Sequence, residues 1–206
     1  FKALKLVAVA DINMDNARAK AAEFDVRAES VEDLLKTSDI DVIVNLTIPD
    51  AHFDVTKSIL NAGKHAYSEK PLVLTLEEGE VLRELAASKN LRIGSAPETF
   101  LGGAHQQARA AIDGGETGRI IGGTCHVMGH GMESWHPNPD FLFQRGAGPV
   151  LDIGPYYVTN LLHLIGPVKS VAALATTNFS TRTIGNGTRE GEVIPVNTPT
   201  NIHALL

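Results

Sequence analysis

Two short segments, far apart in the chain, carry side chains that can accept or release a proton. The first is a Glu-Lys-Pro triplet at residues 69–71, directly after an apolar segment. The second, residues 146–156, contains Asp152 and, four residues further on, Tyr156. An amine, a carboxylate and a phenol are groups that can take up a hydroxyl proton when a hydride leaves the carbon of an alcohol. We therefore treat Lys70, Asp152 and Tyr156 as candidate catalytic residues.

The second segment combines glycines with the start of a predicted helix. Its glycines permit close approach of the backbone to a ligand. Asp152 is placed either to cap the helix or to bind a hydroxyl group, and Tyr156 lies one helical turn beyond it, so both side chains can face one pocket. A capped helix with a half-buried tyrosine explains the same pattern without any function.

A loop rich in Gly, His and Pro precedes this segment and contains Trp135, His136 and Asn138. Aromatic faces stack on the carbons of a sugar ring, and imidazole and amide groups bind its hydroxyls, so the three residues predict a sugar-binding surface. The histidines of this region match no compact ligand motif, and Cys125 is the only cysteine, so no metal site is expected.

The first 97 residues alternate between strand and helix patterns. Such alternation with short connections implies right-handed crossovers and a doubly wound parallel sheet, whose ligands bind at the carboxyl ends of the strands. The predicted strands are 4–10, 41–46, 64–68 and 91–96; the predicted helices are 16–24, 31–36, 50–62 and one that begins with capping-box spacing at Thr75 and Glu78.

Polar residues follow two of these strands. Asp11 stands where a dinucleotide fold places the carboxylate that binds ribose hydroxyls and repels a 2′-phosphate, which favours NAD over NADP as cofactor. The turn from Thr47 through Pro49 to His52 opens a helix whose amino terminus can face a pyrophosphate or a nicotinamide ribose. Each feature also has a structural explanation, since Asp ends strands and Pro starts helices. The glycine-rich turn that precedes such an acid by about 20 residues is absent.

Glu69 and Lys70 follow the strand at 64–68, and we include both among the candidate cofactor contacts. Pro71 restricts Lys70 to an extended backbone. Burial of the Lys70 amine beside the positive ring of an oxidised nicotinamide would favour its neutral form, which can accept a substrate proton. A solvated surface lysine is the simpler explanation of Lys70 taken alone.

Beyond Pro97 the alternation ends, which predicts a domain boundary there. We expect a dinucleotide-binding domain over residues 1–97 and an α+β domain, for substrate binding and oligomerisation, over residues 98–206. The elements predicted in the second domain are helices at 104–113 and 155–165 and strands at 120–128, 169–176 and 202–206.

Composition narrows the class of protein. The chain has 206 residues, a net charge of -6 and an isoelectric point near 5.7, without the clustered basic face that nucleic-acid binders show. A lone cysteine and the lack of a charged start followed by an apolar run indicate a reducing, cytoplasmic setting. No apolar run approaches the ~20 residues that a membrane helix needs, so no membrane partner is expected.

Four segments, in this order and spacing, resemble the Gfo/Idh/MocA family, named after glucose-fructose oxidoreductase, inositol dehydrogenase and a rhizopine-catabolism protein. They are VAVAD at 7–11, DVIVNLTIPDAH at 41–52, GKHAYSEKP at 63–71 and GAGPVLDIGPY at 146–156. The resemblance spans essentially the whole chain. It implies a Rossmann domain followed by a domain with an open, mostly antiparallel sheet, and a homo-oligomer.

The resemblance also implies roles for the candidate residues. Lys70 corresponds to the catalytic lysine of the family and Asp152 to the acid of the substrate domain, whereas Tyr156 stands where many members carry His. The general acid or base is therefore either Lys70 or Tyr156. The family's first strand and glycine-rich phosphate loop would precede Phe1, and more of its sheet would follow Leu206, so the chain is similar to a fragment of a family member.

These expectations give one leading function and two alternatives. The leading function is an NAD(P)-dependent oxidoreductase that acts on a sugar, a polyol or a related cyclic alcohol. One alternative is an NAD-dependent glycoside hydrolase or lyase that oxidises a sugar only transiently. The other is a non-catalytic, dinucleotide-binding subunit, against which Lys70, Asp152 and Tyr156 argue, because a sensor needs no proton-transfer groups.

Overall fold

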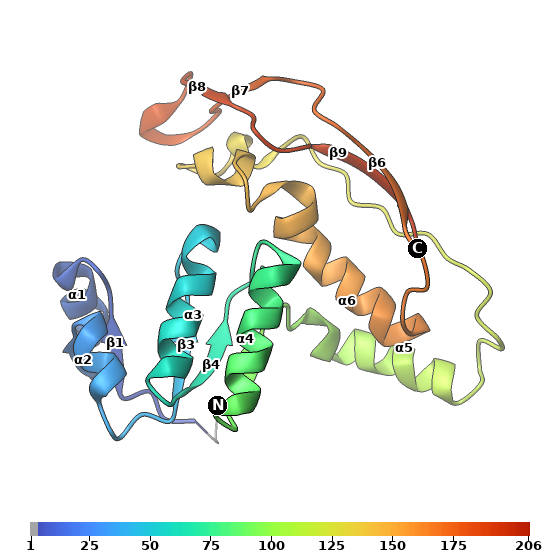
Figure 1. Cartoon of the computed structure of the whole chain (residues 1–206). Helices are drawn as coiled ribbons and strands as arrows, with labels where there is room; N and C mark the ends of the chain where they lie inside the picture. The colour runs from blue at the N-terminus through green and yellow to red at the C-terminus, as the bar shows by residue number, and fades with distance from the viewer. Residues whose placement is uncertain (1–3) are drawn as a thin grey trace. The chain divides into compact units, whose positions relative to one another are not determined.

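The computed structural model describes residues 4–206 and divides into two compact units, Phe1–Ser95 and Ala96–Leu206, here called unit 1 and unit 2 (Figure 1). No helix among residues 4–206 is both long and apolar enough to cross a membrane. Unit 1 contains β1 (Ala8–Ala10), α1 (Met14–Phe24), β2 (Arg27–Glu29), α2 (Val31–Lys36), β3 (Val42–Asn45), a 3₁₀ turn (Pro49–Ala51), α3 (His52–Asn61), β4 (His65–Ser68), α4 (Leu76–Ser88) and β5 (Ile93–Ser95).

All strand pairs described in unit 1 are parallel, which confirms the predicted α/β, Rossmann-like class. β1 pairs with β2, and β3, β4 and β5 form a second ladder in that order. α1 and α2 pack on β1 and β2, and α3 packs on β3, β4 and α4, so that helices and strands bury an apolar core. The buried residues of the core are Ile40, Ile43, Ile59, Leu60, Ala66, Leu82 and Ala86.

Local signals in the sequence correctly locate several helix ends in unit 1. Thr75 and Glu78 form the predicted capping box of α4, since the Glu78 amide donates to Thr75 Oγ1 and the Thr75 amide donates to Glu78 Oε2, both at 3.2 Å. Gly63 follows α3 with a φ of 78°, the left-handed conformation that glycine adopts most easily. α2 spans the predicted residues.

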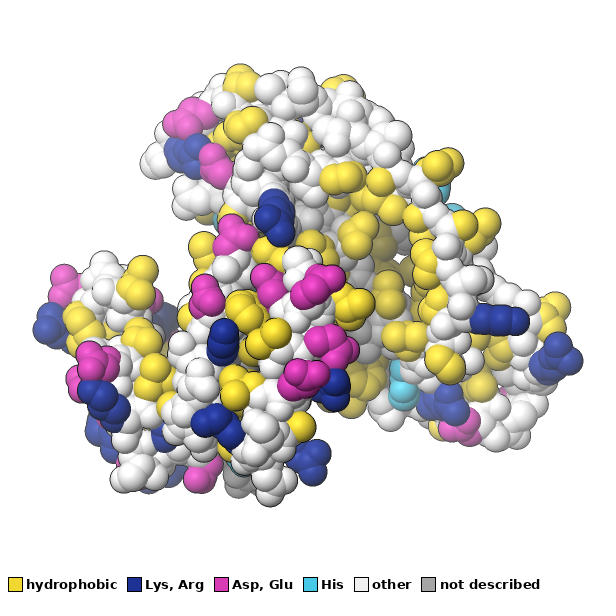
Figure 2. All heavy atoms as spheres, in the orientation of Figure 1, with side chains coloured by type: hydrophobic (Ala, Val, Ile, Leu, Met, Phe, Trp, Pro, Cys, Tyr) yellow, Lys and Arg dark blue, Asp and Glu magenta, His cyan; other side chains and the backbone are white. Residues whose placement is uncertain are grey.

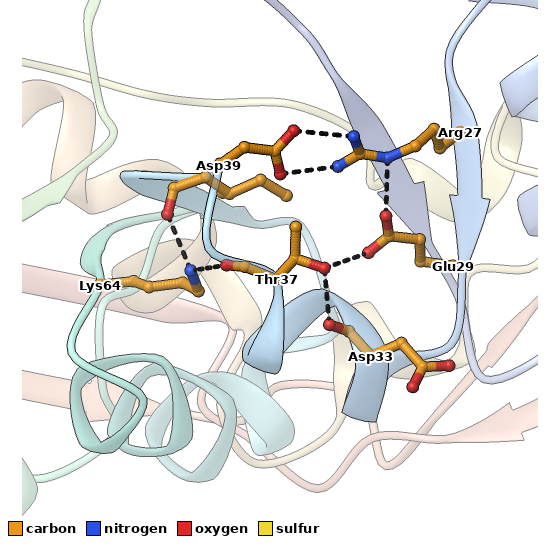
Figure 3. Close-up of polar contacts among 7 residues, drawn as sticks. Arg27, Glu29, Asp33, Thr37, Asp39 and Lys64 are labelled. Atoms are coloured by element: carbon orange, nitrogen blue, oxygen red, sulfur yellow. Dashed lines mark hydrogen bonds and ion pairs between the residues drawn. The ribbon is translucent and has the colours of Figure 1, made fainter.

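A buried lysine joins two connections of unit 1. Lys64, between α3 and β4, is 7% exposed, and its ammonium donates to the carbonyl oxygens of Thr37 and, at 2.8 Å, Ile40 (Figure 3). Both acceptors lie between α2 and β3, so the side chain holds two chain turns together. A buried ammonium needs such partners, because an unsatisfied charge is costly inside a protein.

Beside this lysine, Arg27 of β2 forms a forked ion pair with Asp39. The two Nη atoms of Arg27 donate to the Asp39 carboxylate at 2.8 and 2.9 Å, and Nε donates to Glu29 at 2.8 Å (Figure 3). The guanidinium lowers the pKa of the Asp39 carboxyl below its usual value, through these hydrogen bonds and its charge. Thr37 joins the network by donating to Glu29.

Unit 2 combines two longer helices with antiparallel strands, as predicted. β6 pairs with β9 and β7 pairs with β8, both antiparallel. Its elements are α5 (Gly103–Asp113), α6 (Gly154–Ile165), β6 (Ala172–Thr176), β7 (Thr181–Thr183), β8 (Val193–Pro195) and β9 (Asn201–Leu205), with 3₁₀ turns at Thr99–Leu101, Met132–Ser134, Asp140–Phe143 and Gly187–Arg189 and a π-helical turn at Pro149–Ile153.

The strand predicted at 120–128 does not form. No strand is assigned to these residues, and Ile121 and Met128 are 92% and 88% exposed. Neither a neighbouring strand nor a core therefore stabilises the extended conformation. Gly122 and Gly123 weaken the segment further, since glycine loses the most entropy in a strand. The apolar residues of this segment do not suffice, because strand formation also depends on a partner strand.

Several predicted boundaries differ from the structure by a few residues, and two of these differences have a clear physical reason. The strand expected from residue 4 begins only at Ala8, because Leu4 and Leu6 are 66% and 54% exposed and have no partner strand. The helix expected from Asp50 opens as a 3₁₀ turn, and its α-helical part starts at His52. A tighter first turn after Pro49 is common at the start of a helix.

Candidate active site

Three polar residues lie side by side at the carboxyl ends of neighbouring strands in unit 1. The strand register pairs Asn45 of β3 with Ser68 of β4, and Ser68 with Ser95 of β5. Sequence reasoning considered only the residues after the strands and missed this row. The signal was present, because a polar residue closes the otherwise apolar run of β3. The row borders the edge at which parallel sheets bind ligands.

Asn45 fixes the turn that follows β3. Its side chain is 2% exposed and uses both ends of its amide. Nδ2 donates to the carbonyl of His52 at 3.2 Å and to Thr56 Oγ1 at 3.1 Å, while Oδ1 accepts from the amide of Thr47 at 3.2 Å and from its hydroxyl at 2.7 Å. The Thr47 turn is therefore held in one conformation by a satisfied, buried amide.

His52 joins this turn to the segment that carries Lys70. The imidazole is fully buried, with Nδ1 2.6 Å from the carbonyl oxygen of Pro71 and Nε2 2.8 Å from that of Thr47. Both partners only accept, so a neutral ring can donate to one of them at a time. The structure thus gives His52 a positioning task, and a direct contact with a cofactor stays a prediction.

Glu69 and Lys70 follow β4 directly, as expected of residues at the edge of the sheet. The Glu69 amide donates to the Asn45 carbonyl at 2.8 Å, and Glu69 Oε1 accepts from the Lys70 amide at 2.9 Å. The Glu69 carboxylate therefore orients the backbone at Lys70. The Lys70 side chain is partly buried, and the Lys70–Pro71 peptide bond is cis, for which the sequence contains no signal.

Asp11 lies just after β1 and is partly buried. Its Oδ1 accepts from the amide of Asn13 at 2.7 Å, and Asn13 in turn caps α1 by accepting from the Asp15 amide at 3.0 Å. The carboxylate is thus held at the start of α1 through one oxygen, and a carboxylate has lone pairs for further donors.

The side chains at this edge fit a dinucleotide in their chemistry. A carboxylate such as Asp11 at the end of a parallel strand accepts from ribose hydroxyls. Ser68 Oγ is buried and has no hydrogen-bond partner within residues 4–206. A buried hydroxyl without a partner is costly, and a bound polar group would relieve this cost.

In unit 2, Asp152 lies in the π-helical turn and Tyr156 in the first turn of α6. Of the two roles considered for Asp152, the N-cap position of α6 belongs instead to Ile153, which makes no side-chain capping hydrogen bond. The chain is already turning at Pro149, so the helix needs no cap at Asp152. π-helical turns occur often at functional sites. Both Asp152 and Tyr156 are partly buried.

The glycines before this turn serve the fold itself. Gly148 has a φ of 75°, and a Cβ there would lie 2.8 Å from Thr198 Cγ2 and 3.2 Å from the carbonyl oxygen of Pro199. The close approach that the structure shows is therefore to the chain segment before β9. Any larger residue at position 148 would push that segment away.

Trp135, His136 and Asn138 lie close together on one loop of unit 2. The Trp135 ring is 5.6 Å from the His136 ring, which is 5.5 Å from that of Phe141. The Asn138 amide donates to His136 Nδ1 at 3.1 Å. When the imidazole is neutral, this bond places its proton on Nε2, which makes Nε2 a donor. Trp135 is 60% exposed, which leaves its ring accessible to a ligand.

Within residues 4–206 no group of three or more His, Cys, Asp or Glu side chains is arranged to hold a metal ion. Cys125 is exposed and unpaired by any disulfide in that range.

In comparisons with known proteins, each half of the chain matches the model of a protein family. Residues 1–96 match the model of an oxidoreductase family with an NAD-binding Rossmann fold, and residues 105–206 match the GFO/IDH/MocA C-terminal domain. The chain is 31% identical over 163 residues, 76% of its length, to an uncharacterized oxidoreductase of Schizosaccharomyces pombe. The aligned part covers 42% of that protein. The chain is 25% identical over 190 residues, 89% of its length, to the levoglucosan dehydrogenase of Pseudarthrobacter phenanthrenivorans, of which this covers 48%.

A solved structure agrees in fold. Levoglucosan dehydrogenase in complex with NADH and levoglucosan superposes with a TM-score of 0.76 at 22% identity, over 95% of this chain and 52% of the other. The chain spans about half the length of the curated relatives it matches. With both domain models matched in order along the sequence, the chain belongs to the GFO/IDH/MocA family of oxidoreductases.

Proposed function

We propose that this protein is an NAD-dependent oxidoreductase that transfers a hydride between nicotinamide and the hydroxyl-bearing carbon of a sugar, a polyol or a related cyclic alcohol. The observation that carries the proposal is the set of proton-transfer groups on the two matched domains. Lys70 follows β4 at the carboxyl edge of the parallel strands, and Tyr156 lies about one helical turn beyond Asp152. A purely structural subunit has no need for these groups.

For the cofactor we propose contacts from the edge of unit 1. Asp11 accepts from the adenosine ribose hydroxyls, and its charge disfavours the 2′-phosphate of NADP. The Thr47–Pro49 turn and Glu69 shape the remainder of the site, with Asn45 and His52 holding them in place. When bound, the nicotinamide takes up or releases the hydride.

The protein side chains handle the proton of the same reaction. In the oxidation direction the C–H electron pair leaves with the hydride, the hydroxyl proton passes to a base, and the C–O bond becomes a carbonyl. The base in this proposal is the neutral amine of Lys70 or the phenolate of Tyr156, and Asp152 accepts a hydrogen bond from a substrate hydroxyl to orient it. In the reduction direction the same groups return the proton.

For the substrate we propose a ring with several hydroxyls. The exposed face of Trp135 can stack on ring carbons, while His136 Nε2 and the side-chain amide of Asn138, whose backbone N–H already donates to His136, bind hydroxyls. One relative is named levoglucosan dehydrogenase, and that name gives a sugar derivative as its substrate.

The test is to incubate the protein with NAD and a panel of free cyclic polyols, aldoses and anhydrosugars, and to follow NADH by absorbance. Net accumulation of NADH with at least one of them is expected. A matched panel of glycosides with chromogenic leaving groups distinguishes the alternative reaction. Release of the leaving group without net NADH would replace this proposal by transient oxidation, and no reaction in either panel would contradict both.

We further propose a homo-oligomer in a reducing compartment such as the cytoplasm. All five residues of β6 are exposed, and hydrophobic side chains lie open along β6 and β9 (Figure 2). A second copy of this chain could cover them. The exposed thiol of Cys125 is compatible with a reducing compartment.

A further inference from the structure

The loop with the proposed sugar-binding residues packs against a hairpin from much later in the chain. This hairpin, residues 181–195, consists of β7, β8 and their connection. A small apolar core joins the two segments. Its buried members are Leu142, Phe143, Ile184, Ile194 and Val196, all of them at most 8% exposed, with Met132 packed beside them.

The first polar anchor of the loop is Arg182. Its Nε donates to Glu133 Oε1 at 2.6 Å, and its Nη2 donates to the carbonyl oxygen of His130. Glu133 is 7% exposed, so this ion pair is largely withdrawn from water. Gly131 has a φ of 118°, a conformation that other residues rarely adopt, so the path of the loop favours glycine there.

The second anchor holds the backbone at the tryptophan itself. Asn186 Nδ2 donates to the carbonyl oxygen of Trp135 at 2.6 Å, and the Gly185 amide donates to that of Glu133 at 2.9 Å. These bonds come from the connection between β7 and β8. They fix the backbone on the amino-terminal side of His136.

The third anchor lies on the other side of the aromatic residues. Arg189 forms a forked pair with Asp140, at 2.6 and 3.0 Å. The planar guanidinium matches both carboxylate oxygens, a geometry that lysine cannot reproduce. The hairpin therefore bonds to the loop at residues before Trp135, at the Trp135 carbonyl and at Asp140, which follows His136 and Asn138.

A held loop that presents an exposed aromatic ring is arranged in advance for binding. Ordering a flexible loop during binding costs free energy, and fixing it beforehand removes that cost from the affinity. Trp135 is 60% exposed, so holding its backbone in place adds little apolar burial to the core. Holding the exposed ring in place is useful when a ligand stacks on it.

We propose that Asn186 and Arg189 are positioning residues that set the affinity for the sugar or polyol substrate by holding the loop of Trp135, His136 and Asn138. This inference rests on the proposed function, because it takes that loop as the substrate-binding surface. The two side chains act through the loop and touch neither the reacting carbon nor the cofactor. They therefore influence KM, while the proton-transfer groups govern kcat.

Trp135 is the only tryptophan of the chain, so its fluorescence reports on this loop without any ligand or turnover. The test uses Arg189→Gln and Asn186→Ala, which leave the buried Glu133 paired with Arg182 and so avoid an isolated buried charge. Arg83→Gln, which breaks an exposed pair with Glu80 in α4, is the matched control. Unfolding curves by circular dichroism verify that each variant is folded.

Both loop variants are expected to increase the quenching of Trp135 by acrylamide and to raise KM for the substrate about tenfold, with kcat changed less than about threefold. Arg189→Lys, which keeps the charge but loses the fork, should fall between Arg189→Gln and the wild type. Arg83→Gln should match the wild type in both measurements.

If acrylamide quenches Trp135 in both loop variants only as much as in the wild type, the inference is overturned, whatever their turnover. A loss confined to kcat, with KM unchanged, would overturn it as well. Absence of turnover in the wild-type protein is a different outcome, because it contradicts the proposed function, and with it the assignment of this loop to a substrate.

Discussion

At the scale of single residues, Asp11 has a structural task that the structure shows and a recognition task that we propose. One oxygen accepts from the Asn13 amide at the start of α1, and in the proposed site the carboxylate also binds the adenosine ribose. The two tasks can be separated, since an amide oxygen accepts the same hydrogen bond but carries no charge.

We expect Asp11→Asn to weaken the preference for NAD over NADP by about tenfold, because the repulsion of the 2′-phosphate disappears while the turn remains. The measurement is the ratio of kcat/KM for the two cofactors. Asp15→Asn, at an exposed residue in the first turn of α1, is the control. An unchanged ratio in Asp11→Asn would remove this carboxylate from cofactor selection.

A pH effect is expected at Asp39. Arg27 lowers the pKa of this carboxyl in the folded protein, so the ion pair contributes its full stability above the unfolded value of about 3.9 and loses it as pH falls through the lower, folded-state value. Arg27→Gln should move the titration midpoint of Asp39, followed by carboxyl NMR shifts, up toward the unfolded value. A midpoint that does not move would show that the forked pair is absent in solution.

Sequence reasoning reached the residues at the strand ends but not the contacts that hold them. Asp11, Thr47, Glu69 and Lys70 were found because a parallel sheet gathers its ligands at one edge. The double hydrogen bonding of His52 depends on which backbone atoms meet in three dimensions. No local pattern encodes such a meeting.

At the scale of elements, α4 depends on a reciprocal cap at its first turn. Thr75→Ala should destabilise the protein by about 1 kcal/mol, because the Glu78 amide loses its acceptor. The measurement is the free energy of unfolding in urea. Thr75→Ser, which keeps the hydroxyl, should stay near the wild type, and equal stability of the Ala variant would contradict the capping role.

The same contrast between local and distant signals explains which elements were predicted. The signals that bound α2 and start α4 lie within a few residues of those ends, so the bounds of α2 and the start of α4 followed from the sequence. The segment 120–128 has the composition of a strand but no neighbour to pair with. β7 and β8 went unpredicted because they are short and their stability comes from the loop that packs on them.

At the scale of the whole molecule, the open face of unit 2 predicts self-association. Leu174 in β6 is 78% exposed. We expect the protein to sediment as an oligomer and Leu174→Glu to shift it toward the monomer, because a charge in an apolar interface is costly. Leu76→Glu, at a site 77% exposed in unit 1, is the matched control. A wild-type protein that sediments as a monomer at high concentration would contradict the proposed assembly.

The central proposal is that Lys70 takes part in moving the proton of an alcohol in this member of the GFO/IDH/MocA family, either as the base itself or beside Tyr156. Its most direct test is the kcat of Lys70→Met, measured as NADH formation, beside Lys20→Met, an exposed lysine of α1. The account predicts a kcat lower by about 10²- to 10⁴-fold in Lys70→Met, with NAD affinity within about threefold of the wild type and Lys20→Met unaffected. A Lys70→Met variant that turns over at the wild-type rate would contradict it.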